Sequence, residues 1–216
     1  MRESGATSLA TLLALADSRL PIGGHVHSGG VEEAVSSGLI RDAATVELYL
    51  RRRVRTSGLV AASLAAAVCS GELTPARAEA EADARTPAPA ARAASRAQGR
   101  GLLRLAKQLW PQQDWAALGP RPHLSTVFGM VGAASGVTPL ETAGVVVYTT
   151  LTGAATAAQR LLALDPAAVA ASTFRLTELC DRVAATAVTG LAALSDPLQD
   201  VLAQRHLDRE MPLFAS

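Results

Sequence analysis

The 216-residue chain is poor in aromatic residues and cysteine, and its charges nearly balance. It has three Phe, two Tyr and two Trp, and because aromatic side chains favour strands, this scarcity excludes an all-β fold. Cys69 and Cys180 lie far apart and no Cys-x-x-Cys is present, which excludes a zinc ribbon and a disulfide framework. The formal net charge of +1 provides no overall attraction to nucleic acid or to an anionic membrane.

Common catalytic motifs are missing as well. The sequence has no Gly-x-x-x-x-Gly-Lys-Ser/Thr phosphate loop, no Gly-x-Gly-x-x-Gly, no Gly-x-Ser-x-Gly and no His-Glu-x-x-His. Its start leads into an amphipathic stretch and not into a continuous apolar segment, so we expect no signal peptide and a cytoplasmic protein. The uncharged stretch 143–158 is shorter than the roughly 20 residues of a membrane span and predicts a centrally buried helix instead.

Alanine dominates what is present. The chain has 45 alanines, and alanine is the residue that most favours helix. Because alanine buries little apolar area, Leu and Val must supply most of the core. We therefore predict an all-α fold: one domain over residues 1–216, a helical bundle of roughly eight to ten helices, a Gly/Pro-rich N-terminal loop and a C-terminal tail. Periodicity and capping signals place helices at 9–16, 31–37, 43–69 with a bend at Gly58, 76–85, 90–110, 123–135, 139–164 and 166–194, with a short one from 197.

The N-terminal loop is the least regular segment. Residues 21–30 hold four glycines and a proline, which no regular helix or central strand accommodates. His25 and His27 lie two apart and could bind a metal together with Glu32 or Glu33. The alternatives are a surface loop turned by its glycines and a loop that recognises a partner protein.

Basic side chains form two helical runs. One run recurs every four residues and consists of Arg92, Arg96, Arg100 and Arg104. This stripe is either a solvated face paired with Glu79 and Asp83 or a docking strip for an acidic partner. Residues 51–55 hold four more arginines, which we interpret as a solvated face.

We expect several glycines, both cysteines and one histidine to have structural roles. Gly129, Gly132 and Gly136 predict close helix packing, and the two cysteines are expected to be buried. His206 is expected to be exposed or to cap a helix.

Four segments together resemble the urease accessory protein UreF family. The N-terminal loop, Leu20-Pro-Ile-Gly-Gly-His-Val-His-Ser-Gly-Gly-Val-Glu32, resembles the family's Leu-Pro-x-Gly-(Gly/Ser)-aromatic-Ser-x-Ser-x-Gly-Leu-Glu. Ser95-Arg-Ala-Gln-Gly-Arg-Gly-Leu-Leu-Arg104 and His123-x-x-x-Val-Phe-Gly129 resemble two further family segments. Asp196-Pro-Leu-Gln-Asp200 and Arg205-His206, ending in Leu213-Phe214-Ala-Ser216, resemble the family's C-terminal block.

The resemblance implies a dimerising all-α scaffold that is not an enzyme. UreF-like proteins act with UreD/UreH and the GTPase UreG to deliver nickel to apo-urease, so nickel and GTP would be handled by partner proteins and no cofactor would be bound directly. The implied partner-binding residues are Pro21, Gly23, Gly24, His25, His27, Ser28, Glu32, Arg100, Arg104, His123, Arg205, His206, Arg209 and Phe214. Of these, Phe214 stands in an otherwise polar tail and is the expected partner anchor.

The sequence departs from the family pattern at three positions. His25 stands where the family has an aromatic residue, Val26 replaces a serine, and Pro212 replaces an arginine whose contact Arg209 could make. Two other functions remain open at this point. One is a helical ligand-binding regulator, and the other is a small helical metalloprotein using His25, His27, Glu32 and His123.

Overall fold

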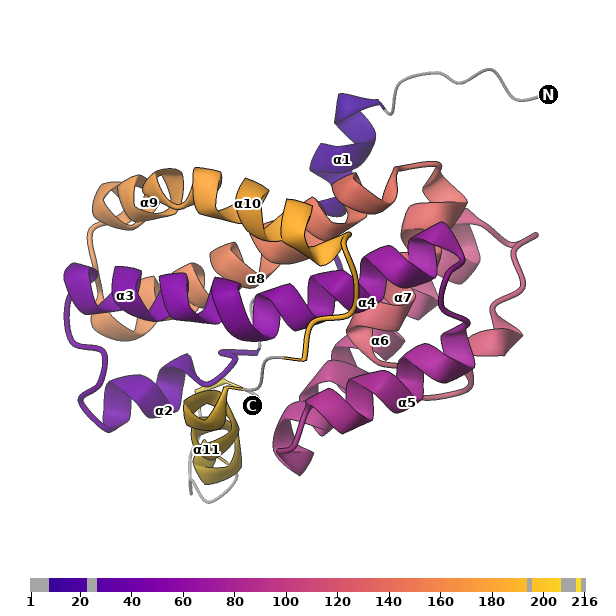
Figure 1. Cartoon of the computed structure of the whole chain (residues 1–216). Helices are drawn as coiled ribbons and strands as arrows, with labels where there is room; N and C mark the ends of the chain where they lie inside the picture. Colours follow the sequence, from indigo (N-terminus) through magenta and orange to yellow (C-terminus); the bar gives the residue numbers. More distant parts are fainter. Residues whose placement is uncertain (1–7, 23–26, 194–195, 207–212, 215–216) are drawn as a thin grey trace.

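The computed structural model describes residues 8–22, 27–193, 196–206 and 213–214, and this part of the chain is all-α (Figure 1). Its eleven α-helices are α1 (Leu9–Leu15), α2 (Val31–Ser36), α3 (Ala43–Arg53), α4 (Leu59–Ser70), α5 (Pro75–Arg85), α6 (Pro89–Leu109), α7 (Leu124–Ser135), α8 (Pro139–Leu162), α9 (Pro166–Arg175), α10 (Thr177–Ala187) and α11 (Pro197–His206). A π-helical segment, η1 (Val54–Gly58), joins α3 to α4, and a 3₁₀ turn, η2 (Ala116–Leu118), precedes α7.

The helix starts follow local capping chemistry. Asp42 accepts a hydrogen bond from the backbone N–H of Thr45, and Thr138 forms the reciprocal pair with Glu141, so both helices begin where the sequence predicts. The bend expected at Gly58 is instead the π-helical turn of η1, through which α3 and α4 continue as one long rod (Figure 1). If α3, η1 and α4 are counted as one helix, the described part of the chain has ten helices, which is the upper end of the predicted eight to ten.

One predicted helix is wrong in its extent. The sequence predicts a single helix over 166–194, but the chain breaks at Leu176 and α10 already ends at Ala187. Leu176 is fully buried, and the break lets α10 pack against α8 and α4 while α9 reaches over to α3. After the end of α10 the chain changes direction at Gly190, whose φ is 150°.

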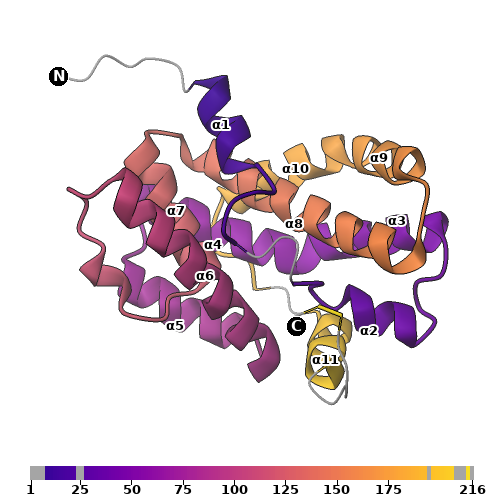
Figure 2. The same ribbon diagram turned by 180° about the vertical axis from the view of Figure 1, so that it is seen from behind.

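The core is built around α8. This helix packs on α4, α7 and α10, and its alanine-rich stretch is buried on most sides, as predicted for residues 143–158. Among the described residues, no helix is long and apolar enough to cross a membrane. Figure 2 shows α8 crossing the rear of the molecule with α6 and α7 to one side, while α2 and α11 form a pair below it.

Two glycines of α7 allow helices to approach closely. A Cβ on Gly129 would lie 2.5 Å from the Cβ of Val68 and 2.6 Å from the carbonyl oxygen of Ala65, both on α4. A Cβ on Gly132 would lie 2.3 Å from the hydroxyl of Thr142 on α8. The prediction of close packing is thus correct for these two. Gly136 instead ends α7, with φ of 78°.

We expect Gly129→Ala to lower the free energy of unfolding by about 1–3 kcal/mol, because the added methyl group collides with the α4 backbone. Gly144→Ala on α8 is the matched control, since its Cβ meets nothing within 4 Å and alanine raises stability by up to about 1 kcal/mol through helix propensity. Urea denaturation of both variants gives the measurement. Equal effects in the two would contradict the close contact.

Candidate functional site

The N-terminal loop rests on the glycine-rich part of α6. A Cβ on Gly101 would lie only 1.8 Å from the carbonyl oxygen of Pro21, and one on Gly99 would lie 2.2 Å from that of Pro122. No residue with a side chain fits at either position without moving the backbone opposite. The Gly-Arg-Gly sequence of α6 therefore positions both the N-terminal loop and the start of α7.

The second half of the loop is held from α3 and α11. Gly29 and Gly30 have φ of 59° and 87°, the left-handed region that glycine reaches without strain. Arg53 Nη1 donates to the carbonyl oxygen of Gly29 at 2.6 Å and to Oε1 of Gln199 at 2.7 Å. The hydroxyl of Tyr49 donates to the same carbonyl at 3.2 Å. Burial raises the pKa of Tyr49, outweighing the opposing charge of Arg53, so the phenol stays a neutral donor.

The arginine-rich run 51–55 is therefore not simply a solvated face, which corrects the sequence interpretation. Arg53 is half-buried against the loop. Arg52 binds the buried carboxylate of Asp196 at 2.6 Å, and the hydroxyl of Thr56 donates to the same carboxylate at 2.8 Å. The run connects α3 and η1 to the segment that begins α11. Nothing local in the sequence indicates this role, because its partners lie about 140 residues away.

Glu32 joins the start of α2 to the C-terminal part of the described chain. Its buried carboxylate contacts Nε2 of His206 at 2.9 Å and accepts hydrogen bonds from the backbone N–H groups of Leu213 at 2.8 Å and Phe214 at 3.0 Å. The neighbouring Glu33 pairs with Arg205 at 3.2 Å. The first turn of α2 thus binds both the last turn of α11 and the C-terminal segment.

Hydrogen bonding decides the charge state of Glu32. Burial opposes ionisation, but the backbone N–H of Leu213, the side chain of His206 and the N–H of Phe214 together outweigh it, so the pKa of Glu32 lies below its ordinary value of 4.5. The residue is an anion at neutral pH and acts as an acceptor only.

A second buried histidine organises α5, α6 and α7. The ring of His123 contacts the hydroxyl of Ser95 at 3.0 Å and a carboxylate oxygen of Asp83 at 2.9 Å, and its backbone N–H donates to Glu79 at 2.9 Å. Arg96 binds both carboxylates, each at 2.9 Å. Burial would raise the pKa of Asp83, but the bonds from His123 and Arg96 outweigh it and lower that pKa.

The arginine stripe of α6 divides into two parts. Arg92 and Arg96 pair with acidic residues of α5, as the sequence interpretation of a solvated, paired face expects. Arg100, Arg104 and Lys107 are exposed, and within the described part of the chain none of them has a carboxylate partner. The second part of the stripe is thus a band of uncompensated positive charge.

Several predicted site residues face inward. His206 is 3% exposed and Phe214 is 6% exposed, which corrects the expectation of an exposed histidine. The Phe214 ring lies under the guanidinium of Arg160, 5.0 Å from its carbon, so the exposed apolar residue of this segment is Leu213, at 78%. Ser28, Glu32 and His123 are also buried, and Pro21 and His27 are half-buried.

The remaining predicted residues divide into two groups. Arg100, Arg104 and Arg205 are exposed. Gly23, Gly24, His25 and Arg209 lie outside the described residues, as do Val26 and Pro212. In the described part, no three His, Cys, Asp or Glu side chains gather as a metal site, and Glu32 and His123 belong to separate clusters.

Comparison with known proteins identifies relatives over nearly the whole chain. The sequence model of the UreF family matches residues 40–177. A protein of Mycobacterium sp. strain JLS named urease accessory protein UreF is 70% identical over 210 residues, which covers 97% of this chain and all of the relative. Proteins of the same name from Mycolicibacterium vanbaalenii and Mycobacterium tuberculosis are 68% and 62% identical, with the same coverage.

We expect Glu32→Gln to destabilise the protein by about 1–3 kcal/mol, because an amide NH₂ would face a donor in a buried position. Glu47→Gln is the matched control. It removes one partner of the more exposed pair with Arg175, and such pairs contribute less than about 1 kcal/mol. Denaturant unfolding measures both, and limited proteolysis should cleave the C-terminal segment faster in Glu32→Gln alone. Equal losses would show that Glu32 does not secure this segment.

Acid should destabilise the fold through three carboxylates. The pKa values of Glu32, Asp83 and Asp196 are lowered in the folded protein, so their contribution is complete above the ordinary values of 4.5 and 3.8 and is lost as the pH falls through the lower folded values. The free energy of unfolding should therefore decline below about pH 4.5. In Glu32→Gln the decline should be shallower. An identical pH profile in the variant would contradict the assigned charge of Glu32.

Proposed function

The chain belongs to the UreF family of urease accessory proteins, and from this we propose that it is the scaffold on which UreD/UreH and the GTPase UreG assemble to load nickel into apo-urease. A urease accessory protein acts in urease maturation together with other components of that process and is not itself an enzyme. The specific partners and the scaffold role are our proposal.

The observation that carries the proposal is the meeting of two distant segments at Glu32. The N-terminal loop and the C-terminal block, which both resemble UreF segments, meet at α2 and α11. There the backbone N–H of Leu213 donates to Glu32, and the Leu213 side chain is exposed. A leucine held exposed on a partly charged surface offers apolar area that a partner protein can bury. We propose that this α2–α11 surface binds UreD/UreH.

A second proposed contact is the unpaired part of the α6 stripe. Arg100 and Arg104 can bind an acidic partner without first giving up an internal ion pair, and arginine suits such pairs because its planar fork meets carboxylates at two points. We propose that this strip binds UreG. The sequence lacks a P-loop, so in this scheme GTP is bound by that partner. Nickel is the cargo of the assembly.

Exposed apolar side chains support a homodimer. Phe174 is 76% exposed, and Leu9 and Leu13 of α1 are 69% and 63% exposed. Leu9 and Leu13 lie one turn apart on α1, and a contiguous exposed apolar patch is what marks an association surface. We propose a homodimer in the cytoplasm.

The test is co-purification of the tagged chain with co-expressed UreD/UreH and UreG from the same organism. We expect Leu213→Asp to lower recovery of UreD/UreH, and Arg100→Glu/Arg104→Glu to lower recovery of UreG, each by about tenfold or more because a buried or paired contact becomes unfavourable. The purified chain alone should show no GTP hydrolysis.

Matched controls carry the same chemical changes at other exposed positions. Leu140→Asp introduces one carboxylate at a half-exposed leucine of α8, and Arg41→Glu/Arg55→Glu reverses two exposed arginines that lack an ion pair in the described chain. These controls should retain both partners. If the wild-type chain purifies alone in the presence of both proteins, the scaffold proposal is wrong.

A further inference from the structure

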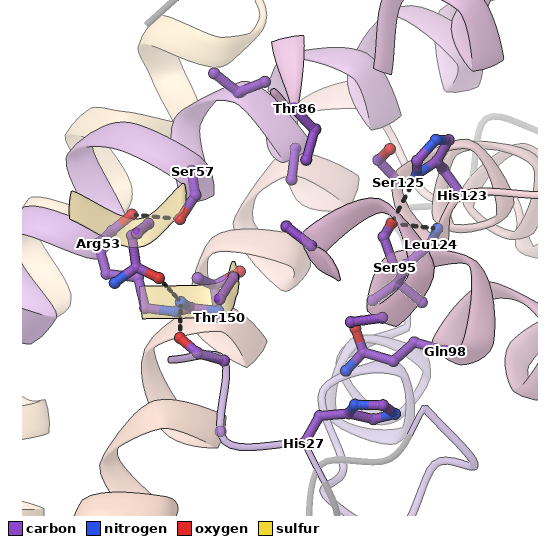
Figure 3. A pocket seen from close by; sticks show the side chains of 18 of the residues that line it. His27, Arg53, Ser57, Thr86, Ser95, Gln98, His123, Leu124, Ser125 and Thr150 are labelled. Atoms are coloured by element: carbon purple, nitrogen blue, oxygen red, sulfur yellow. Dashed lines mark hydrogen bonds between the residues drawn. The ribbon is translucent and has the colours of Figure 1, made fainter. Parts of the chain in front are cut away.

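A cavity of about 260 Å³ lies between the N-terminal loop and the helices η1, α4, α6, α8 and α11 (Figure 3). Apolar side chains, among them Val60, Leu64 and Phe128, line part of its wall. Polar side chains gather at its sides, with Arg53 and Ser57 at one end and Gln98 and His123 toward the other, as Figure 3 shows. The volume approaches the lower limit of typical small-molecule sites.

Unsatisfied hydrogen-bonding atoms concentrate at this cavity. In the described chain three buried side-chain polar atoms lack a hydrogen-bond partner, and two of them, Ser28 Oγ and Arg53 Nε, belong to residues that line it. Ser28 is 1% exposed, so its hydroxyl is shielded from bulk solvent. A buried donor without a partner is costly, and a site with two of them is one that a ligand would complete.

The guanidinium of Arg53 shows which kind of group is missing. Its Nη1 is occupied by the carbonyl oxygen of Gly29 and by Gln199. Its Nε, on the edge shared with Nη2, donates to no described residue, and Arg53 has no carboxylate partner in the described chain. That edge presents two parallel N–H groups, the geometry that a carboxylate matches with both oxygens.

Neither carboxylate among the described residues of the cavity wall pairs with Arg53. Of the two carboxylates in the cavity wall, Asp196 is neutralised by Arg52. Asp200 accepts from the backbone N–H of Ala88, at the end formed by α6. The hydroxyls of Ser57 and Thr150 donate to backbone carbonyls and carry no charge that would offset that of Arg53.

We propose that this cavity is a binding site for a small carboxylate, held side-on by the Nε and Nη2 groups of Arg53 and by the hydroxyl of Ser28. The ligand satisfies the two unpartnered donors, and its apolar part meets the apolar side chains that line the cavity. The inference goes beyond the scaffold role, because it rests on the cavity alone and requires no partner protein.

The experiment is saturation-transfer NMR on the methyl signal of acetate with the full-length chain, in chloride buffer of constant sodium concentration. We expect a saturable signal for the wild type. Arg53→Gln keeps an amide donor for Gly29 but removes the charged fork, and should weaken acetate binding about tenfold or more. Arg55→Gln removes an exposed arginine two residues away, outside the cavity wall, and should bind as the wild type does.

A second pair of variants tests the cavity without touching Arg53 or Ser28. Gly153 lines the cavity on α8 and its Cβ would meet nothing within 4 Å, so Gly153→Leu fills the space and should abolish the acetate signal. Gly144→Leu adds the same side chain to open space elsewhere on α8 and should leave the signal intact. Equal unfolding midpoints in chloride confirm that the leucine variants are folded. No saturable signal in the wild type, or one that survives in Gly153→Leu, would overturn the proposal.

Discussion

The described structure depends on one buried carboxylate. Glu32 begins α2 at the end of a glycine-rich loop and accepts hydrogen bonds from two backbone N–H groups near the C-terminus, with His206 as its third partner. A buried anion is costly unless donors surround it, so this contact forms only when α2, α11 and the C-terminal segment are all in place. The contact therefore links α2, α11 and the C-terminal segment, which are far apart in sequence, in one cooperative unit.

The rest of the molecule is arranged to present those elements correctly. Two left-handed glycines turn the loop into α2, and Arg53 and Gln199 hold that turn from the long α3–α4 rod and from α11. On the other side, Gly101 lets the loop lie directly on α6. Small residues set these distances, because a helix that lacks side chains at the contact allows backbone to approach backbone.

An alanine-rich core alone would specify little, since small side chains fit many arrangements. The buried polar clusters supply the missing specificity. His123 binds α7 to Asp83 of α5 and Ser95 of α6, and Asp196 binds the start of α11 to Arg52. These networks disfavour other registers, because a shift would leave a partly buried charged group without its partner. The cluster at His123 fixes α6, which carries the unpaired arginines, while Glu32 holds the backbone of Leu213.

By itself the sequence determined the all-α class, most helix starts and the family-like segments, because capping and periodicity act between residues a few positions apart. Asp42 and Thr138 cap their helices for that reason. Only the tertiary structure decided that α9 and α10 break at Leu176, that Arg53 turns inward, and that His206 and Phe214 are buried at Glu32. Each of these outcomes depends on a partner far away in the chain, and periodicity within one helix carries no information about which distant residue will stand opposite.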